Sequence, residues 1–161
     1  MGWIIAVLTS SDASSQGLRD DTSGQILRAA MTDGVGEVRY TAVLPDDRTM
    51  LENQMKTWIE QGVDLVVTTG GTGLGPRDVM PEATMGIADR VVPGIAEAMR
   101  AASLDYTPFA MLSRGIAAVC KQALIINFPG SPKAVSQLVP VVKPILPHAL
   151  ALLHGNTAHD A

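Results

Sequence analysis

The chain has few aromatic residues, few charged residues and a single cysteine. Of its 161 residues, 4% are aromatic and 17% are charged, and Cys120 is the one cysteine. This excludes an intramolecular disulfide and a metal site built from cysteines, and it favours a reducing cytoplasm. The formal net charge is −4 and the lysines and arginines do not cluster. We therefore expect neither nucleic acid nor an acidic membrane surface among its partners.

The composition that remains is typical of a globular core. Hydrophobic residues make up 47% of the chain, which excludes a disordered protein. A chain of this size buries roughly 70% of its unfolded surface. No repeat or linker divides it, so we expect a single domain over residues 1–161. The apolar start, Met1–Leu8, lacks a basic flank and is too short to span a membrane, which indicates a core strand.

Short apolar runs alternate with helical patterns along the chain. Strands are expected near 3–9, 37–43, 64–69 and 122–128, with one or two more between 109 and 119, and helices at 22–33, 49–61, 79–88, 93–104 and 132–153. Continuous apolar strands separated by helices indicate a buried, largely parallel sheet. The sequence therefore predicts an α/β fold of three layers, a mostly parallel sheet with helices on both faces.

A glycine-rich loop follows the third predicted strand. Residues 68–78 read Thr-Thr-Gly-Gly-Thr-Gly-Leu-Gly-Pro-Arg-Asp. Gly70, Gly71, Gly73 and Gly75 are expected to take positive φ and to let the main chain approach a ligand. A turn that presents successive backbone amides binds anions, and phosphate is the anion that we expect here. The loop matches neither a Walker A sequence nor G-x-G-x-x-G, and a tight strand-to-helix connection is the alternative.

Polar segments follow each of the four strands that we expect to be parallel. They are Thr9–Asp12, Pro45–Asp47, the glycine loop and Asn127–Lys133. Ligands of open α/β sheets bind outside the carboxyl ends of the strands. We therefore expect the four segments to converge on one site.

These segments resemble a known family, the molybdopterin adenylyltransferases of molybdenum-cofactor biosynthesis. This MogA/MoaB type also occurs as the G domain of plant Cnx proteins and of gephyrin. The matching motifs are Thr68–Gly73, Arg77-Asp78-Val79, Pro81–Thr84, Pro93-Gly94, Leu112-Ser113-Arg114 and Asn127–Lys133. The resemblance covers nearly the whole chain.

The resemblance implies a MogA-like fold and a reaction in which AMP passes from MgATP to the phosphate of molybdopterin, with release of pyrophosphate. It implies that Asp46 and Asp78 are catalytic and hold Mg²⁺. Implied substrate-binding residues are Ser10, Asp12, Thr69, Gly70, Gly71, Thr72, Gly73, Ser113, Arg114, Gly130, Ser131 and Lys133. The family also implies a homotrimer and a contact with the molybdenum insertase.

Elementary chemistry gives the two aspartates a role in such a reaction. A phosphate monoester has a second pKa of about 6, so it is mostly dianionic at neutral pH. It therefore needs positioning and charge neutralisation more than a strong general base. Mg²⁺ favours one or two carboxylates together with phosphate oxygens and waters. Asp46 and Asp78 suit the reaction if the metal lies between them and the phosphates.

Simpler structural roles are open for several of these residues. Asp47 or Thr49 suits a helix cap, and Asp46 suits a turn. Asp78 suits the cap of a helix that begins at Val79. Asp12 suits an Asx turn, and Arg114 suits a pair with a core carboxylate. Ser131 suits an N-cap before Pro132, a geometry that also aims helix amides at an anion.

Two other functions fit the same segments. A non-catalytic molybdopterin-binding or carrier protein would keep the glycine loop but would not need Asp46 and Asp78. A CinA-like nucleotide pyrophosphatase would use water as the nucleophile. The transferase is favoured because both aspartates are present.

Overall fold

The computed structural model describes residues 2–157, which form a six-stranded sheet in the order β2-β1-β3-β6-β5-β4. The strands are β1 (Trp3–Ser10), β2 (Gly36–Leu44), β3 (Leu65–Thr69), β4 (Arg90–Val91), β5 (Ala117–Cys120) and β6 (Ala123–Phe128). Strands β2, β1, β3 and β6 are parallel, whereas β5 is antiparallel to both β6 and β4. The carboxyl ends of the parallel strands therefore lie along one edge.

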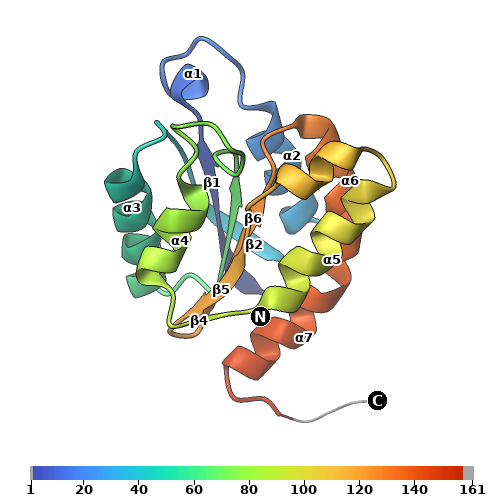
Figure 1. The fold of residues 1–161 in the computed structure, drawn as a ribbon. Coiled ribbons are helices and arrows are strands. Elements are labelled where there is room, and N and C mark those ends of the chain that lie inside the picture. The colour runs from blue at the N-terminus through green and yellow to red at the C-terminus, as the bar shows by residue number, and fades with distance from the viewer. Residues whose placement is uncertain (1, 158–161) are drawn as a thin grey trace.

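Helices cover both faces of this sheet (Figure 1). They are α1 (Asp12–Ser15), α2 (Thr22–Thr32), α3 (Arg48–Glu60), α4 (Met80–Ile87), α5 (Pro93–Leu104), α6 (Pro132–Val142) and α7 (Leu146–Leu153), with 3₁₀ helices η1 (Pro108–Leu112) and η2 (Lys143–Ile145). Helices α3 and α4 lie on one face, and α2, α5, α6 and α7 lie on the other. The α/β fold class with three layers is confirmed.

Each face of the sheet has its own hydrophobic cluster, because successive strand residues point to opposite sides. Ile5 and Val7 of β1 pack with α2, α5, α6 and α7. Ala6 and Leu8, which alternate with them, pack with α3 and α4. All four side chains are at most 2% exposed, so β1 is a central strand that is buried on both sides.

The expected strands and helices are found, with four differences. The segment at 109–119 contains one strand, β5, preceded by η1, and β5 runs antiparallel. The two-residue edge strand β4 and the short helix α1 were not expected. The helix expected at 132–153 is divided by η2, where Pro144 lacks the amide that a continuous helix needs. The expectation of one domain over 1–161 stays a prediction.

Helix ends follow the expected capping chemistry in two places. Asp47 caps α3, with its carboxylate accepting the Met50 amide at 2.9 Å. Ser131 caps α6, with Pro132 as the first helical residue. By length and composition alone, Pro132–Leu153 could cross a membrane. However, Val135, Leu138, Val142, Leu146 and Leu150 of this segment are buried against the sheet, so these five side chains serve packing.

Candidate functional site

The four polar segments converge at the carboxyl edge of the parallel strands. Ser10 at the end of β1 donates a hydrogen bond to Asp46, which follows β2, at 2.5 Å between oxygens. Thr69 at the end of β3 donates to the carbonyl of Pro129, which follows β6, at 2.7 Å. The expected convergence is therefore confirmed.

Glycine is required at the start of the loop after β3. Gly70 has φ +89°, and a Cβ there would lie 2.2 Å from the carbonyl oxygen of Ser10. Gly71 has φ +71°. Gly73 and Gly75 do not take positive φ, so the expectation for them was wrong. A Cβ at either would instead lie within 2.9 Å of Asp78 Oδ2, because the loop wraps closely around that carboxylate.

The first half of this loop presents free backbone donors. Within residues 2–157, no hydrogen bond uses the amides of Gly71, Thr72 or Gly73. The Gly71 carbonyl accepts the Met80 amide at 3.0 Å, which ties the loop to the start of α4. Three successive amides without protein acceptors are the arrangement by which such turns bind anions, and anion binding by this loop stays a prediction.

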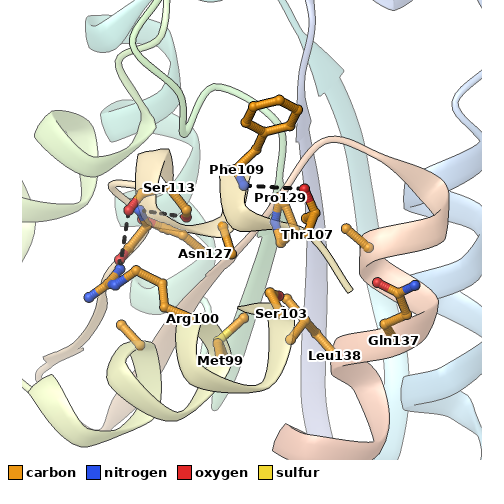
Figure 2. Close-up of a pocket in the computed structure, with 14 residues that line it drawn as sticks. Met99, Arg100, Ser103, Thr107, Phe109, Ser113, Asn127, Pro129, Gln137 and Leu138 are labelled. Atoms are coloured by element: carbon orange, nitrogen blue, oxygen red, sulfur yellow. Dashed lines mark hydrogen bonds between the residues drawn. The ribbon is translucent and has the colours of Figure 1, made fainter. Parts of the chain in front are cut away.

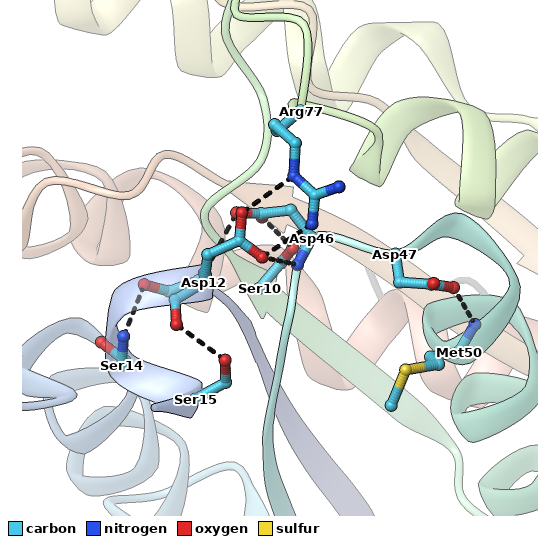
Figure 3. A network of polar contacts seen from close by, with 9 residues as sticks. Ser10, Asp12, Ser14, Ser15, Asp46, Asp47, Met50 and Arg77 are labelled. Carbon is cyan, nitrogen blue, oxygen red and sulfur yellow. Dashed lines mark hydrogen bonds and ion pairs between the residues drawn. The ribbon is translucent and has the colours of Figure 1, made fainter. Parts of the chain in front are cut away.

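The carboxylates of Asp12 and Asp46 each accept a hydrogen bond from the backbone amide of the other residue (Figure 3). The Asp12 carboxylate accepts the Asp46 amide at 2.9 Å, and the Asp46 carboxylate accepts the Asp12 amide at 3.1 Å. This reciprocal pair joins residues from two neighbouring strand ends. It brings two carboxylates and the Ser10 hydroxyl together, although hydrogen bonds to backbone amides are what fix them.

Arg77, from the far end of the glycine loop, binds Asp12 with two hydrogen bonds of 2.9 Å, from Nε and Nη2 (Figure 3). Hydrogen bonding by Arg77, followed by that of the Asp46 backbone, lowers the pKa of Asp12 to about 2. The pair is exposed, with the Arg77 side chain 62% accessible. Sequence reasoning placed Arg77 in a matching motif but did not identify its partner, which is 65 residues away.

Asp78 turns back toward the loop that carries it. Its Oδ2 accepts the Gly75 amide at 2.9 Å. The N-cap of α4 is Val79, which makes no side-chain capping bond, so a capping role for Asp78 is excluded. Within residues 2–157, Oδ1 of Asp78 accepts no hydrogen bond. One oxygen thus shapes the loop and the other has unused acceptor capacity.

Arg114 braces the same loop from the other side of the site. Its guanidinium donates to the Gly73 carbonyl at 2.8 Å, to the Asp78 carbonyl at 2.8 Å and to Glu82 Oε1 at 2.6 Å. The second Glu82 oxygen is buried and has no partner within the described residues. Glu82 therefore depends on Arg114 for charge compensation, and the expected pair with a carboxylate is found.

A cavity of about 160 Å³ lies between α5, η1 and α6, next to the carboxyl end of β6 (Figure 2). Met99, Ala110 and Leu138 supply apolar surface, and Ser113 and Gln137 supply polar groups. Asn127 and Pro129 connect it with the strand ends. Ser113 is the predicted substrate residue that lines this cavity.

The remaining predicted residues lie where β6 leads into α6. The Gly130 carbonyl accepts the Ser23 hydroxyl at 2.7 Å, and a Cβ at Gly130 would lie 3.3 Å from Gly70 Cα. Lys133 is exposed in the first turn of α6, and no ion pair of the described residues includes it. The α6 N-terminus therefore adds positive potential beside the glycine loop.

The donor set around Asp46 suits a hard cation. Carboxylate and hydroxyl oxygens are ligands that Mg²⁺ accepts, usually with phosphate oxygens and waters completing the octahedron. No group of three or more acidic, histidine or cysteine side chains within residues 2–157 is placed to hold a metal. The residues thus fit a metal that arrives already bound to phosphates better than one held by the protein alone.

The fold and this edge define a class of α/β proteins that bind a ligand outside the carboxyl ends of a parallel sheet. Comparison with known proteins identifies the family. Residues 6–148 match the family described as "Probable molybdopterin binding domain". The chain belongs to this family of molybdenum-cofactor biosynthesis proteins.

Similar proteins include some that are close to this chain in length and some that are much longer. The chain is 39% identical over 155 residues to a molybdopterin adenylyltransferase of Helicobacter pylori, covering 94% of this chain and 88% of that protein. It is 41% identical to gephyrin of Dictyostelium discoideum, covering 96% of this chain but spanning only 23% of gephyrin. The structure resembles the molybdopterin biosynthesis enzyme MoaB of Thermus thermophilus with a TM-score of 0.89 and 44% identity, covering 95% and 97% of the two chains. The expected family and MogA-like fold are confirmed.

Proposed function

We propose that this chain is a molybdopterin adenylyltransferase. The observation that supports it most directly is the convergence of free loop amides, the Asp12–Asp46 pair and an adjoining cavity at one sheet edge. The relatives that are named as adenylyltransferases align with most of the chain. The substrates are then ATP and molybdopterin.

In the proposed reaction, a terminal oxygen of the molybdopterin phosphate attacks the α-phosphorus of ATP. The new P–O bond forms as the bond to the bridging β-phosphate oxygen breaks, and pyrophosphate leaves with that electron pair. The loop amides bind phosphate oxygens and Lys133 adds positive charge. Asp46 and Asp78 would hold Mg²⁺, which neutralises the phosphates when bound. Because the dianionic phosphate is already a nucleophile, orientation supplies most of the rate.

The cavity between α5, η1 and α6 suits the planar, partly polar pterin. Ser103, Thr107 and Gln137 offer hydrogen-bonding groups within a lining that also contains Met99 and Leu138. Ser113 would contact the ligand directly, whereas the observed contacts favour an indirect, loop-bracing role for Arg114. Further parts of the proposal rest on the family alone: a homotrimer, a contact with the molybdenum insertase and a cytoplasmic location.

One assay separates this function from its alternatives. The purified chain is incubated with MgATP, with and without molybdopterin, and pyrophosphate is measured. Release that requires the pterin supports the transferase. Release without pterin would indicate a CinA-like pyrophosphatase, and no release would indicate a binding or carrier protein.

A further inference from the structure

The Asp12–Asp46 pair of the site is bound by a cationic side chain of the same protein, Arg77. Among the ion pairs of residues 2–157, only that of Arg77 and Asp12 involves the Asp12–Asp46 pair. Both Asp12 oxygens accept hydrogen bonds from the guanidinium, and Oδ1 also accepts the Asp46 amide. The guanidinium thus neutralises part of the charge that the site presents to an approaching cation.

The contact is suited to exchange. An ion pair between exposed side chains contributes little net free energy, because water solvates both charges and holding two long side chains in one geometry costs entropy. The Arg77 side chain is 62% accessible. Its guanidinium makes no other hydrogen bond within the described residues. A guanidinium binds phosphate in the same bidentate way as carboxylate. Arg77 can therefore change partner at little cost in free energy.

We propose that Arg77 is the resident counter-ion of the Asp12–Asp46 pair when nucleotide is absent, and that it moves to the triphosphate when a metal cation arrives with ATP. This inference rests on the proposed metal role of Asp46. Arg77 is then a positioning residue of the free enzyme and a phosphate ligand of the nucleotide complex. The exchange couples the release of Arg77 from Asp12 to the arrival of metal and phosphate together.

Binding of Mn²⁺ alone tests the first half. Free Mn²⁺ is measured by electron paramagnetic resonance in wild type, Arg77→Gln and Arg39→Gln. Arg39→Gln is the control, because it removes another exposed ion pair, the one between Arg39 and Glu37. Removing the resident cation should tighten Mn²⁺ binding by up to about thirtyfold, the effect of one unit charge about 4 Å from a divalent cation in water. Arg39→Gln should match wild type. Equal affinity in Arg77→Gln and wild type would overturn the proposal.

Binding of inorganic pyrophosphate in metal-free buffer tests the second half. Asp12→Asn releases Arg77 and should raise pyrophosphate affinity. In the double variant Asp12→Asn/Arg77→Gln most of that gain should disappear. If the double variant keeps the full gain in pyrophosphate affinity, loss of the Asp12 charge alone explains that gain. This result would overturn the proposed transfer of Arg77 to phosphate.

These measurements use neither molybdopterin nor turnover. If they succeed while pterin-dependent pyrophosphate release fails, the counter-ion exchange stands and the transferase does not. If turnover succeeds while the affinities for Mn²⁺ and pyrophosphate do not depend on Arg77, the proposed exchange is wrong and the transferase stands. Circular dichroism of each variant confirms that it is folded.

Discussion

At the scale of single residues, the two predicted catalytic aspartates have different surroundings. Asp46 is fixed by the Ser10 hydroxyl and the Asp12 amide. Asp78 uses one oxygen to shape the glycine loop. In the proposed function, both carboxylates oppose phosphate when no metal is bound, and both would hold a metal that neutralises the phosphates. Binding and chemistry should therefore respond oppositely when these charges are removed.

We expect Asp46→Asn and Asp78→Asn to bind molybdopterin at least as well as wild type in metal-free buffer. Adenylyl transfer in MgATP should fall by about two decades or more, equivalent to about 2.7 kcal/mol of lost transition-state stabilisation. Single-turnover pyrophosphate release and pterin titration measure both effects. Asp47→Asn is the matched control, since Asp47 only caps α3 and Asn also caps helices. Wild-type transfer rates in the first two variants would place the metal elsewhere.

The steric requirement for glycine at position 70 can be tested by comparison with a second glycine, which has a similar φ but open space around its Cα. Gly70→Ala places a Cβ 2.2 Å from the Ser10 carbonyl oxygen, whereas Gly34, with φ +83°, has no atom within 4 Å of such a Cβ. Gly34→Ala should cost only the backbone strain, about 1–2 kcal/mol. Gly70→Ala should cost more and should weaken ATP binding. Equal unfolding free energies and unchanged ATP affinity would contradict the role given to the loop.

The Asp12–Arg77 pair predicts a response to acid. The pKa of Asp12 is lowered from 3.8 to about 2, so the pair contributes stability above the unfolded-state pKa, and this contribution is lost as the pH falls toward 2. Arg77→Gln should move the Asp12 pKa back toward its ordinary value. Carboxyl chemical shifts followed by NMR from pH 5 to about pH 2 measure this. An unchanged titration in Arg77→Gln would show that Arg77 does not determine the pKa.

At the scale of elements, the site depends on how the loop between β3 and α4 is held. Arg114 donates to carbonyls near both ends of this loop and to Glu82 on α4. Arg114→Gln should therefore raise the KM for ATP. It should also destabilise the fold by about 1–3 kcal/mol, because Glu82 loses its partner. Thermal unfolding should show partial recovery in Arg114→Gln/Glu82→Gln, and no recovery would exclude the charge as the cause.

The elements that the sequence predicted are those with strong local patterns. Strands β1, β3 and β6 are buried on both faces and read as apolar runs, and Asp47 and Ser131 carry the capping chemistry of α3 and α6. The antiparallel direction of β5 was not predicted. Its turn to β6 contains Lys121 at φ 54°, whereas a typical hairpin turn contains glycine or asparagine.

The candidate site is predictable as a set of segments but not as a set of contacts. The order of apolar strands and polar strand ends is enough to predict that Asp46 and the glycine loop share one edge of the sheet. The pairing of Arg77 with Asp12, and of Arg114 with two loop carbonyls, depends on side-chain contacts between residues that lie 65, 41 and 36 positions apart. Local sequence patterns carry no signal for such contacts.

At the scale of the whole molecule, the proposed assembly is a homotrimer. Several large hydrophobic side chains, including Tyr106, Phe109 and Met111, are exposed on the described surface, and subunit contacts are enriched in such residues. Light scattering should give a mass near three times 16.9 kDa, independent of concentration in the working range. A monomer at all concentrations would contradict the assembly.

The proposed reaction joins AMP to the molybdopterin phosphate. The most direct measurement is a single turnover with ATP labelled at the α-phosphorus, followed by separation of pterin and nucleotide products. We expect the label to appear on the pterin, in a molar amount equal to the pyrophosphate released, and we expect Asp78→Asn to form little of this product. Label found only in free AMP, with the pterin unchanged, would show hydrolysis and would contradict the transferase activity.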